Sequence, residues 1–468
     1  MICRLRLGVA LLIWVVLVAQ AQQEKPARKG GSRQPIQDPK CNDVPAHPFD
    51  FILGRPTANS VTVSVLCYSD TQSFIAFGTQ KGQLTSQTPA RLFKGGEPSE
   101  ILLSGLKSNS QYFYQLRSAT TNSSEDSFHT ARPPGSTFTF TITADSHLDE
   151  HTDPVLYQRT LAGASAEAPD FHIDLGDTFM TEKHVSREAA ARQYLAQRYC
   201  FGQLCQSAPL FLVLGNHDGE SLRGRGPDGN GLAVWSNITR KRYFPNPVPD
   251  DFFTGNKTPR PEASLLQDYY AWEWGDALFV VLDPFWFTPK QRGQADNWNF
   301  TLGIEQYRWL KGTLESSTAR FKFVFIHHLV GGIDSQCRGG AEAAGFYEWG
   351  GKNPDSSDGF QEHRPGWPMP IHQLLLQNKV NIVFHGHDHF YARQELDGIV
   401  YQEVPQPGFP SDDRVPRSAA EYGYKSGVIR PSSGYLRVMI SPESARVDYL
   451  RTKPVSAAQM MDHYRMLP

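Results

Sequence analysis

The stretch TFTFTITADSH (residues 137–147) combines a strand pattern with two side chains that can bind metal. Its apolar residues alternate with threonine, which predicts a β-strand, and Asp145 and His147 follow directly after it. A carboxylate and an imidazole two residues apart can reach one cation. Asp and His after a strand are nevertheless common turn residues, so this stretch alone predicts a strand and only suggests a site.

Four further apolar runs end in residues of the same kind. Residues 171–175 lead to Gly176 and Asp177, residues 210–214 to Asn216 and His217, residues 321–326 to His327 and His328, and residues 380–384 to His385, His387 and His389. A crossover helix fits between Asp145 and Asp177, so we expect parallel strands whose ends share one rim. Buried histidines after such apolar runs are costly unless hydrogen-bonded or metal-bound, so five such ends together predict a metal centre.

The patterns around these runs predict two domains. Residues 41–132 contain short alternating strands separated by turn residues, which predicts a small all-β sandwich. Residues 133–455 alternate strands with helices, expected at 186–199 and 304–314, which predicts an α/β domain. Residues 456–468 are expected to form a C-terminal tail.

The N-terminal residues are typical of an export signal. Arg4 and Arg6 precede an apolar run, and a small-x-small site ends at Ala21, so we expect residues 1–21 to be cleaved and 22–40 to be a disordered linker. The alternative is an uncleaved anchor, but roughly thirteen apolar residues are short for a span of ~20. We therefore expect a secreted or periplasmic protein without a membrane anchor after cleavage, in which Cys200 and Cys205 are the best placed to form a local disulfide.

The charge balance excludes recognition of polyanions by a global field. Lys and Arg total 46 against 48 Asp and Glu, for a formal net charge of -2. No nucleic-acid or anionic-lipid binding is expected, and an anionic ligand must be held locally.

The motifs Asp-x-His, Gly-Asp, Gly-Asn-His-Asp, a strand-end His and Gly-His-x-His, in this order over about residues 137–392, resemble the calcineurin-like metallophosphoesterase family. With Leu103 to Tyr114 resembling the closing strands of fibronectin type III domains, the layout is similar to that of purple acid phosphatases. The resemblance implies a four-layer α/β/β/α sandwich after a fibronectin III-like domain. It also implies a dinuclear centre in which one metal is bound by Asp145, His147, Asp177 and His389, and the second by the bridging Asp177 with Asn216, His327 and His387.

Two positions decide details of this ligand set. His327 is preferred over His328 because family members place this ligand three residues after a strand valine, here Val324; His328 is the alternative. Purple acid phosphatases have a tyrosine ligand in Gly-Asp-x-x-Tyr, whereas this chain has Met180, so we expect no tyrosinate-ferric site. The mixed N and O donors suit iron, manganese or zinc.

The expected function is hydrolysis of small-molecule phosphate esters by a metal-bridging hydroxide, with monoesters ahead of diesters. His217, with Asp218 available to orient it, is the candidate for contacting the phosphate and protonating the leaving group. The alternatives are a phosphodiesterase or nucleotide hydrolase using the same site, and an extracellular binding protein with a silent metal domain. Metallo-β-lactamase-like and amidohydrolase sites fit poorly, because they need a His-x-His early in the chain and here it comes last.

Overall fold

The computed structural model describes residues 44–119, 121–149, 151–221, 231–288, 297–332, 338, 340–410 and 415–468. The predicted signal peptide (1–21) and linker (22–40) lie outside these ranges. Across the described ranges, no helix is both long enough and apolar enough to cross a membrane.

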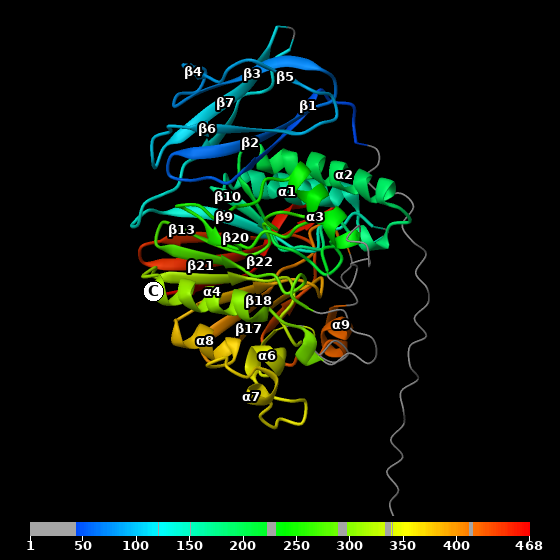
Figure 1. The fold of residues 1–468 in the computed structure, drawn as a ribbon, viewed down its shortest axis with the longest axis vertical. Coiled ribbons are helices and arrows are strands. Elements are labelled where there is room, and N and C mark those ends of the chain that lie inside the picture. Colours follow the sequence, from blue (N-terminus) through cyan, green and yellow to red (C-terminus); the bar gives the residue numbers. More distant parts are fainter. Residues whose placement is uncertain are drawn as a thin grey trace, which may run out of the picture. The chain divides into compact units, whose positions relative to one another are not determined.

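The first described region is all-β, as expected (Figure 1). Antiparallel pairing joins β1, β2 and β6 in one sheet and β4, β3, β7 and β8 in another, with β5 paired to β3. Alternate residues of the strands face a shared core that includes Val63, Ile75 and Tyr114. The strands are β1 (Phe49–Gly54), β2 (Ser60–Cys67), β3 (Thr71–Gly78), β4 (Ser86–Gln87), β5 (Arg91–Phe93), β6 (Ser99–Ser104), β7 (Gln111–Ser118) and β8 (Asp126–His129).

A six-stranded sheet follows, in the order β11-β10-β9-β20-β21-β22. Its first three strands are parallel, with Phe140 opposite Phe171, and its last three are antiparallel. The connections within the parallel part are the helices α1 (Pro154–Ala166), which Asp153 caps, and α2 (Arg187–Cys205), which Ser186 caps. The strands are β9 (Phe138–Thr143), β10 (Phe171–Asp174), β11 (Leu210–Leu212), β20 (Tyr435–Ser441), β21 (Ser444–Lys453) and β22 (Ser456–Met466).

An eight-stranded sheet has the order β12-β13-β14-β15-β16-β18-β17-β19. Its central strands β14, β15, β16 and β18 are parallel, with Val324 opposite Val383, and antiparallel strands close both edges. The strands are β12 (Thr254–Gly255), β13 (Tyr270–Trp274), β14 (Ala277–Val281), β15 (Phe321–Phe325), β16 (Ile382–His385), β17 (Tyr391–Leu396), β18 (Ile399–Glu403) and β19 (Val428–Arg430).

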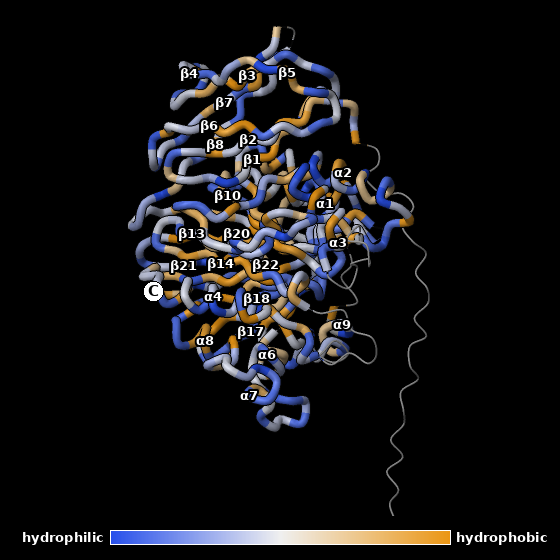
Figure 2. Tube along the Cα trace, in the orientation of Figure 1, coloured by the Kyte–Doolittle hydropathy of each residue, from blue (hydrophilic) through white to orange (hydrophobic). Residues whose placement is uncertain are grey.

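The two large sheets pack face to face between layers of helices. Phe140, Phe171, Phe279 and Phe325 belong to the core between the sheets, where the apolar segments gather in Figure 2. α1 and α2 share a core with the outer face of the six-stranded sheet, and α4, α6 and α8 share one with the outer face of the eight-stranded sheet. This confirms the four-layer α/β/β/α sandwich. The remaining helices are α3 (Leu232–Tyr243), α4 (Gly303–Ser316), α5 (Gly340–Ala343), α6 (Tyr347–Gly350), α7 (Phe360–His363), α8 (Ile371–Gln377) and α9 (Val415–Glu421).

Two sequence-based expectations are wrong. The expected C-terminal tail is largely β22, which pairs with β21 over its whole length and buries Tyr464. Most of its residues are exposed, so it lacks the apolar pattern of a buried strand. The expected disulfide is absent, because Cys205 is a free thiol. Both cysteines lie in α2, where five residues of separation turn their side chains about 140° apart.

Candidate metal centre

The candidate ligands all follow the carboxyl ends of parallel strands. Asp145 follows β9, Asp177 follows β10 and Asn216 follows β11, three neighbouring strands of the six-stranded sheet. His327 follows β15, and both His387 and His389 follow β16, the neighbouring strand in the eight-stranded sheet. The site is therefore assembled from both sheets.

Asp145, His147 and His389 form the first cluster, in which one ligand atom of each lies within 4.8 Å of the others. His389 Nε2 lies 3.3 Å from Asp145 Oδ1 and 3.3 Å from His147 Nε2. Two imidazole nitrogens and a carboxylate oxygen thus face one point, which is the arrangement that a cation requires.

Asp177, His327 and His387 form the second cluster by the same criterion. His327 Nε2 lies 3.3 Å from Asp177 Oδ2 and 3.1 Å from Asn216 Oδ1, so the asparagine belongs to this group as well. The same His327 nitrogen is 4.0 Å from Asp145 Oδ1, which places the two clusters side by side. All seven predicted ligands therefore lie together, whereas the assignment of each ligand to a metal stays a prediction.

His328, the alternative ligand, lies beside this centre. Its ring packs against His387 with 4.6 Å between ring centroids. Burial lowers the pKa of His328 to about 3, with the neighbouring His327 charge adding to the effect. Among the described residues, the groups that could hold a metal include His327 and not His328.

Unsatisfied buried atoms indicate that these residues fit metal ions. Asp145 Oδ1 and His387 Nε2 are buried and make no hydrogen bond. Leaving such atoms unpaired costs about 1–3 kcal/mol each, and a cation bound in each cluster would satisfy them. The donor set of two carboxylates, one amide oxygen and four imidazoles suits iron, manganese or zinc.

The backbone at the site is strained in a consistent way. The φ angles of Asp145, Asp177, His387 and His389 are 55°, 53°, 86° and 66°, in the left-handed region that such residues seldom adopt. Gly386 allows one close approach, because a Cβ there would lie 2.8 Å from Asp145 Oδ2. These backbone turns bring ligand side chains from successive strand ends to one place.

Charged groups in the centre shift one another's pKa values. Burial opposes the charged form of His327, but Asp177 and Asp145 outweigh it and raise the pKa of His327 to about 10. Burial likewise opposes ionisation of Asp177, but the His327 charge dominates and holds the pKa of Asp177 well below its usual value. In the metal-free protein a proton on His327 thus supplies part of the positive charge that the carboxylates attract.

Hydrogen bonds on the far side of the rings orient two ligands. His147 Nδ1 lies 3.1 Å from Asp149 Oδ2, and His327 Nδ1 lies 2.8 Å from the carbonyl oxygen of Leu175. These contacts leave each Nε2 facing the centre. Asp149 was not predicted from the sequence, although a carboxylate two residues after a proposed histidine ligand is a usable signal. The backbone carbonyl of Leu175 gives no such signal.

His217 has a different partner from the one expected. Its Nδ1 lies 2.5 Å from Glu182 Oε1, and its backbone N–H donates to Asp177 Oδ1 at 2.7 Å. Asp218 is instead buried and accepts hydrogen bonds from four backbone N–H groups, those of Asp177, Thr178, Phe179 and Gly215. The expectation that Asp218 orients His217 is therefore wrong. The Asp218 carboxylate instead joins the turn after β10 to the turn after β11 by accepting hydrogen bonds from both. Glu182 was not predicted from the sequence.

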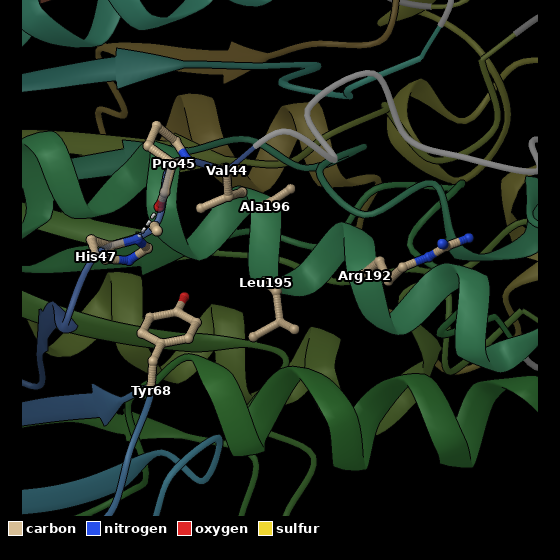
Figure 3. Close-up of a pocket in the computed structure, with 8 residues that line it drawn as sticks. Val44, Pro45, His47, Tyr68, Arg192, Leu195 and Ala196 are labelled. Atoms are coloured by element: carbon tan, nitrogen blue, oxygen red, sulfur yellow. Dashed lines mark hydrogen bonds between the residues drawn. The ribbon is translucent and has the colours of Figure 1, made fainter.

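A separate cavity of about 350 Å³ lies elsewhere, and none of the seven candidate ligands lines it. It is bordered by Val44 to His47, by Tyr68, and by Arg192, Leu195 and Ala196 of α2 (Figure 3). Its lining is mainly apolar and differs in chemistry from the His and Asp centre.

The model of the calcineurin-like phosphoesterase family matches residues 138–391, which is more than half of the 468-residue chain. The chain belongs to the calcineurin-like phosphoesterase family. This phosphoesterase is similar in fold to the structure of PhoD, with 14% identity, a TM-score of 0.63 and coverage of 92% of this chain and 91% of that one. A purple acid phosphatase from yellow lupin (Lupinus luteus) aligns with 16% identity, a TM-score of 0.59 and coverage of 89% and 74%. No curated protein sequence matches the phosphoesterase.

Family membership and the two clusters agree. The matched region contains every candidate ligand from Asp145 to His389. At low sequence identity the two solved structures establish the fold alone. Met180, which follows Asp177 by three residues, is buried.

Proposed function

We propose that this phosphoesterase is an exported hydrolase of small-molecule phosphate esters that depends on two metal ions and prefers monoesters. The observation that carries the proposal is the convergence of two groups of ligand atoms, one at Asp145, His147 and His389 and one at Asp177, His327 and His387. Buried atoms without partners in both groups support metal occupancy.

In this proposal the first metal is bound by Asp145, His147, Asp177 and His389, and the second by Asp177, Asn216, His327 and His387. Two such ions would supply a hydroxide nucleophile at neutral pH and neutralise charge on the phosphoryl oxygens. Asp145 and Asp177 contribute two negative charges, so a centre loaded with divalent ions keeps a net charge of about +2 and attracts phosphate locally.

His217 is proposed to protonate the leaving oxygen. Its side chain is 29% exposed, so substrate can reach it. The Glu182 carboxylate holds Nδ1 and thereby fixes the ring, which leaves Nε2 to donate the proton. The hydrogen bond from its backbone N–H to Asp177 ties this group to the metal centre.

The test compares p-nitrophenyl phosphate with bis-p-nitrophenyl phosphate and measures metal content by elemental analysis. We expect two metals per chain, faster hydrolysis of the monoester, and loss of activity by at least ~100-fold in Asp177→Asn. Equal activity of that variant would reject the site. Faster diester hydrolysis would make the protein a phosphodiesterase, and two metals without turnover would favour the silent binding protein.

Export is tested separately. The Arg4 and Arg6 pair, the apolar run and the Ala19-Gln20-Ala21 site support cleavage after Ala21. N-terminal sequencing of the protein purified from its own cells should begin at Gln22, and an intact Met1 would reject the cleavage.

A further inference from the structure

Gln406 lies at the first cluster although no sequence motif marks it. It follows β18, is 1% exposed, and places its side-chain Nε2 3.4 Å from His147 Nε2 and 3.5 Å from His147 Nδ1. The Gln406 amide therefore borders the metal-facing nitrogen of a candidate ligand.

The backbone that carries this amide is restrained by its surroundings. Pro405 and Pro407 flank it and restrict its backbone. The carbonyl groups of the next two residues bind the α1 region: Pro407 O accepts from Thr160 Oγ1 at 2.9 Å, and Gly408 O accepts from the Asp153 N–H at 2.9 Å. The backbone from which the Gln406 side chain extends is therefore held in place without substrate.

Thr152 determines which end of the amide faces the cluster. The Thr152 hydroxyl donates to the carbonyl of His147, so its oxygen is left to accept a hydrogen bond. Gln406 Nε2 lies 3.5 Å from that oxygen and donates to it. The NH₂ end of Gln406, and not its oxygen, therefore points toward His147.

The second N–H of Gln406 has no acceptor on His147 once a metal is bound. His147 Nδ1 is engaged by Asp149 Oδ2 at 3.1 Å, and His147 Nε2 faces Asp145 and His389 as a metal ligand would. A buried donor without an acceptor is costly, so an oxygen held at the first metal is the natural acceptor.

We propose that Gln406 is a phosphate-binding residue, which donates a hydrogen bond to an oxygen of the phosphoryl group held at the first metal. The inference rests on the proposed function and deepens it. A neutral donor fixed beside the metals strengthens binding of a tetrahedral oxyanion without adding charge to the centre.

The test measures binding of inorganic phosphate to the metal-loaded protein by calorimetry. Gln406→Leu removes the donor at similar volume, and Gln406→Glu keeps the shape but replaces the donor with a negative charge. We expect phosphate Kd to rise about tenfold in Gln406→Leu and further in Gln406→Glu, with two metals per chain retained. Gln373→Glu, at an exposed position of α8, is the matched control and should bind phosphate as the unmodified protein does.

Three outcomes would overturn the inference. Phosphate Kd within twofold of the unmodified protein in both variants would show that the amide does not contact phosphate. Loss of one metal in Gln406→Leu would make Gln406 a support of the metal instead. A fall in kcat with unchanged phosphate Kd would assign the hydrogen bond to the nucleophile. If the unmodified, metal-loaded protein itself neither bound phosphate nor hydrolysed esters, the proposed function would fail first.

Discussion

His217 Nδ1 and Glu182 Oε1 lie 2.5 Å apart, with 29% and 42% of the two side chains exposed. Glu182 belongs to the short 3-10 turn η1 (Thr181–Lys183), which follows the candidate ligand Asp177 after three intervening residues. One segment thus supplies both a candidate metal ligand and the partner of the proposed acid, so the imidazole and the candidate centre are positioned together.

Replacing Glu182 with glutamine should slow turnover more than it weakens binding. We expect kcat to fall about 10–100-fold, and more for alkyl phosphates than for p-nitrophenyl phosphate, because a poor leaving group depends more on protonation. Steady-state kinetics with both substrates measures this. Glu188→Gln, at an exposed residue in the first turn of α2, is the control, and equal losses for both substrates would contradict the assignment of His217 as acid.

Metal affinity should rise with pH. The pKa of His327 is raised to about 10 in the metal-free protein, so a metal must displace a proton there at any lower pH. Affinity should therefore increase up to about tenfold per pH unit between pH 7 and 9 and level off above 10. Chelator-buffered zinc titrations at several pH values measure it, and an affinity independent of pH over this range would refute the assignment.

The raised pKa of His327 should also make the metal-free fold less stable as the pH rises. Because the folded pKa of His327 lies above the usual 6.5, its ion pairs stabilise the fold fully below pH 6.5, and this contribution is lost as the pH rises toward about 10. Urea denaturation of chelator-treated protein should therefore show a stability that declines over this interval. A free energy of unfolding that rises there would contradict the ion pairing.

Gly386→Ala should weaken the first metal site selectively. The new Cβ would lie 2.8 Å from Asp145 Oδ2 and 2.9 Å from Ala144 Cβ, so the carboxylate must move. We expect metal content to fall from two toward one per chain while circular dichroism stays unchanged. Gly345→Ala is the matched control, since its Cβ would meet no atom within 4 Å. Retention of both metals in Gly386→Ala would show that metal binding does not require Asp145 in its present position.

Asp218→Ala should destabilise the protein even without metal. The buried carboxylate accepts four backbone hydrogen bonds, and its removal leaves those donors unpaired. We expect a loss on the order of 3 kcal/mol in the free energy of unfolding, measured by urea denaturation of metal-free protein. A loss below about 0.5 kcal/mol would mean that water replaces the carboxylate.

The sequence allowed prediction of those features that depend on buried strands and their ends. Continuous apolar runs marked β10, β15 and β16, and the side chains after them are the ones that gather in the centre. β22 was not predicted because it is an edge strand, which needs few apolar residues and so lacks a recognisable strand pattern. Glu182 and Gln406 could not be assigned because their roles arise from tertiary contacts between segments far apart in the chain.

Helix length explains the error over the cysteines. The helix expected at 186–199 continues to Cys205, so the two cysteines expected to form a local disulfide lie in one continuous helix.

The role expected for Asp218 was wrong because neighbours in sequence need not be partners in the fold. Asp218, next to His217 in sequence, accepts hydrogen bonds from backbone N–H groups, whereas Glu182, 35 positions away in sequence, contacts the His217 ring.

Because residues from both large sheets form the centre, the centre can exist only late in folding. The backbone of His387 donates to Asp145 across 242 residues of sequence, so neither sheet alone can form the centre. Closing so long a loop is entropically expensive, and the two ions would act as late cross-links that hold the sheets together after docking. Release of metal during unfolding should then coincide with separation of the sheets, which makes metal release a reporter of the integrity of the whole domain.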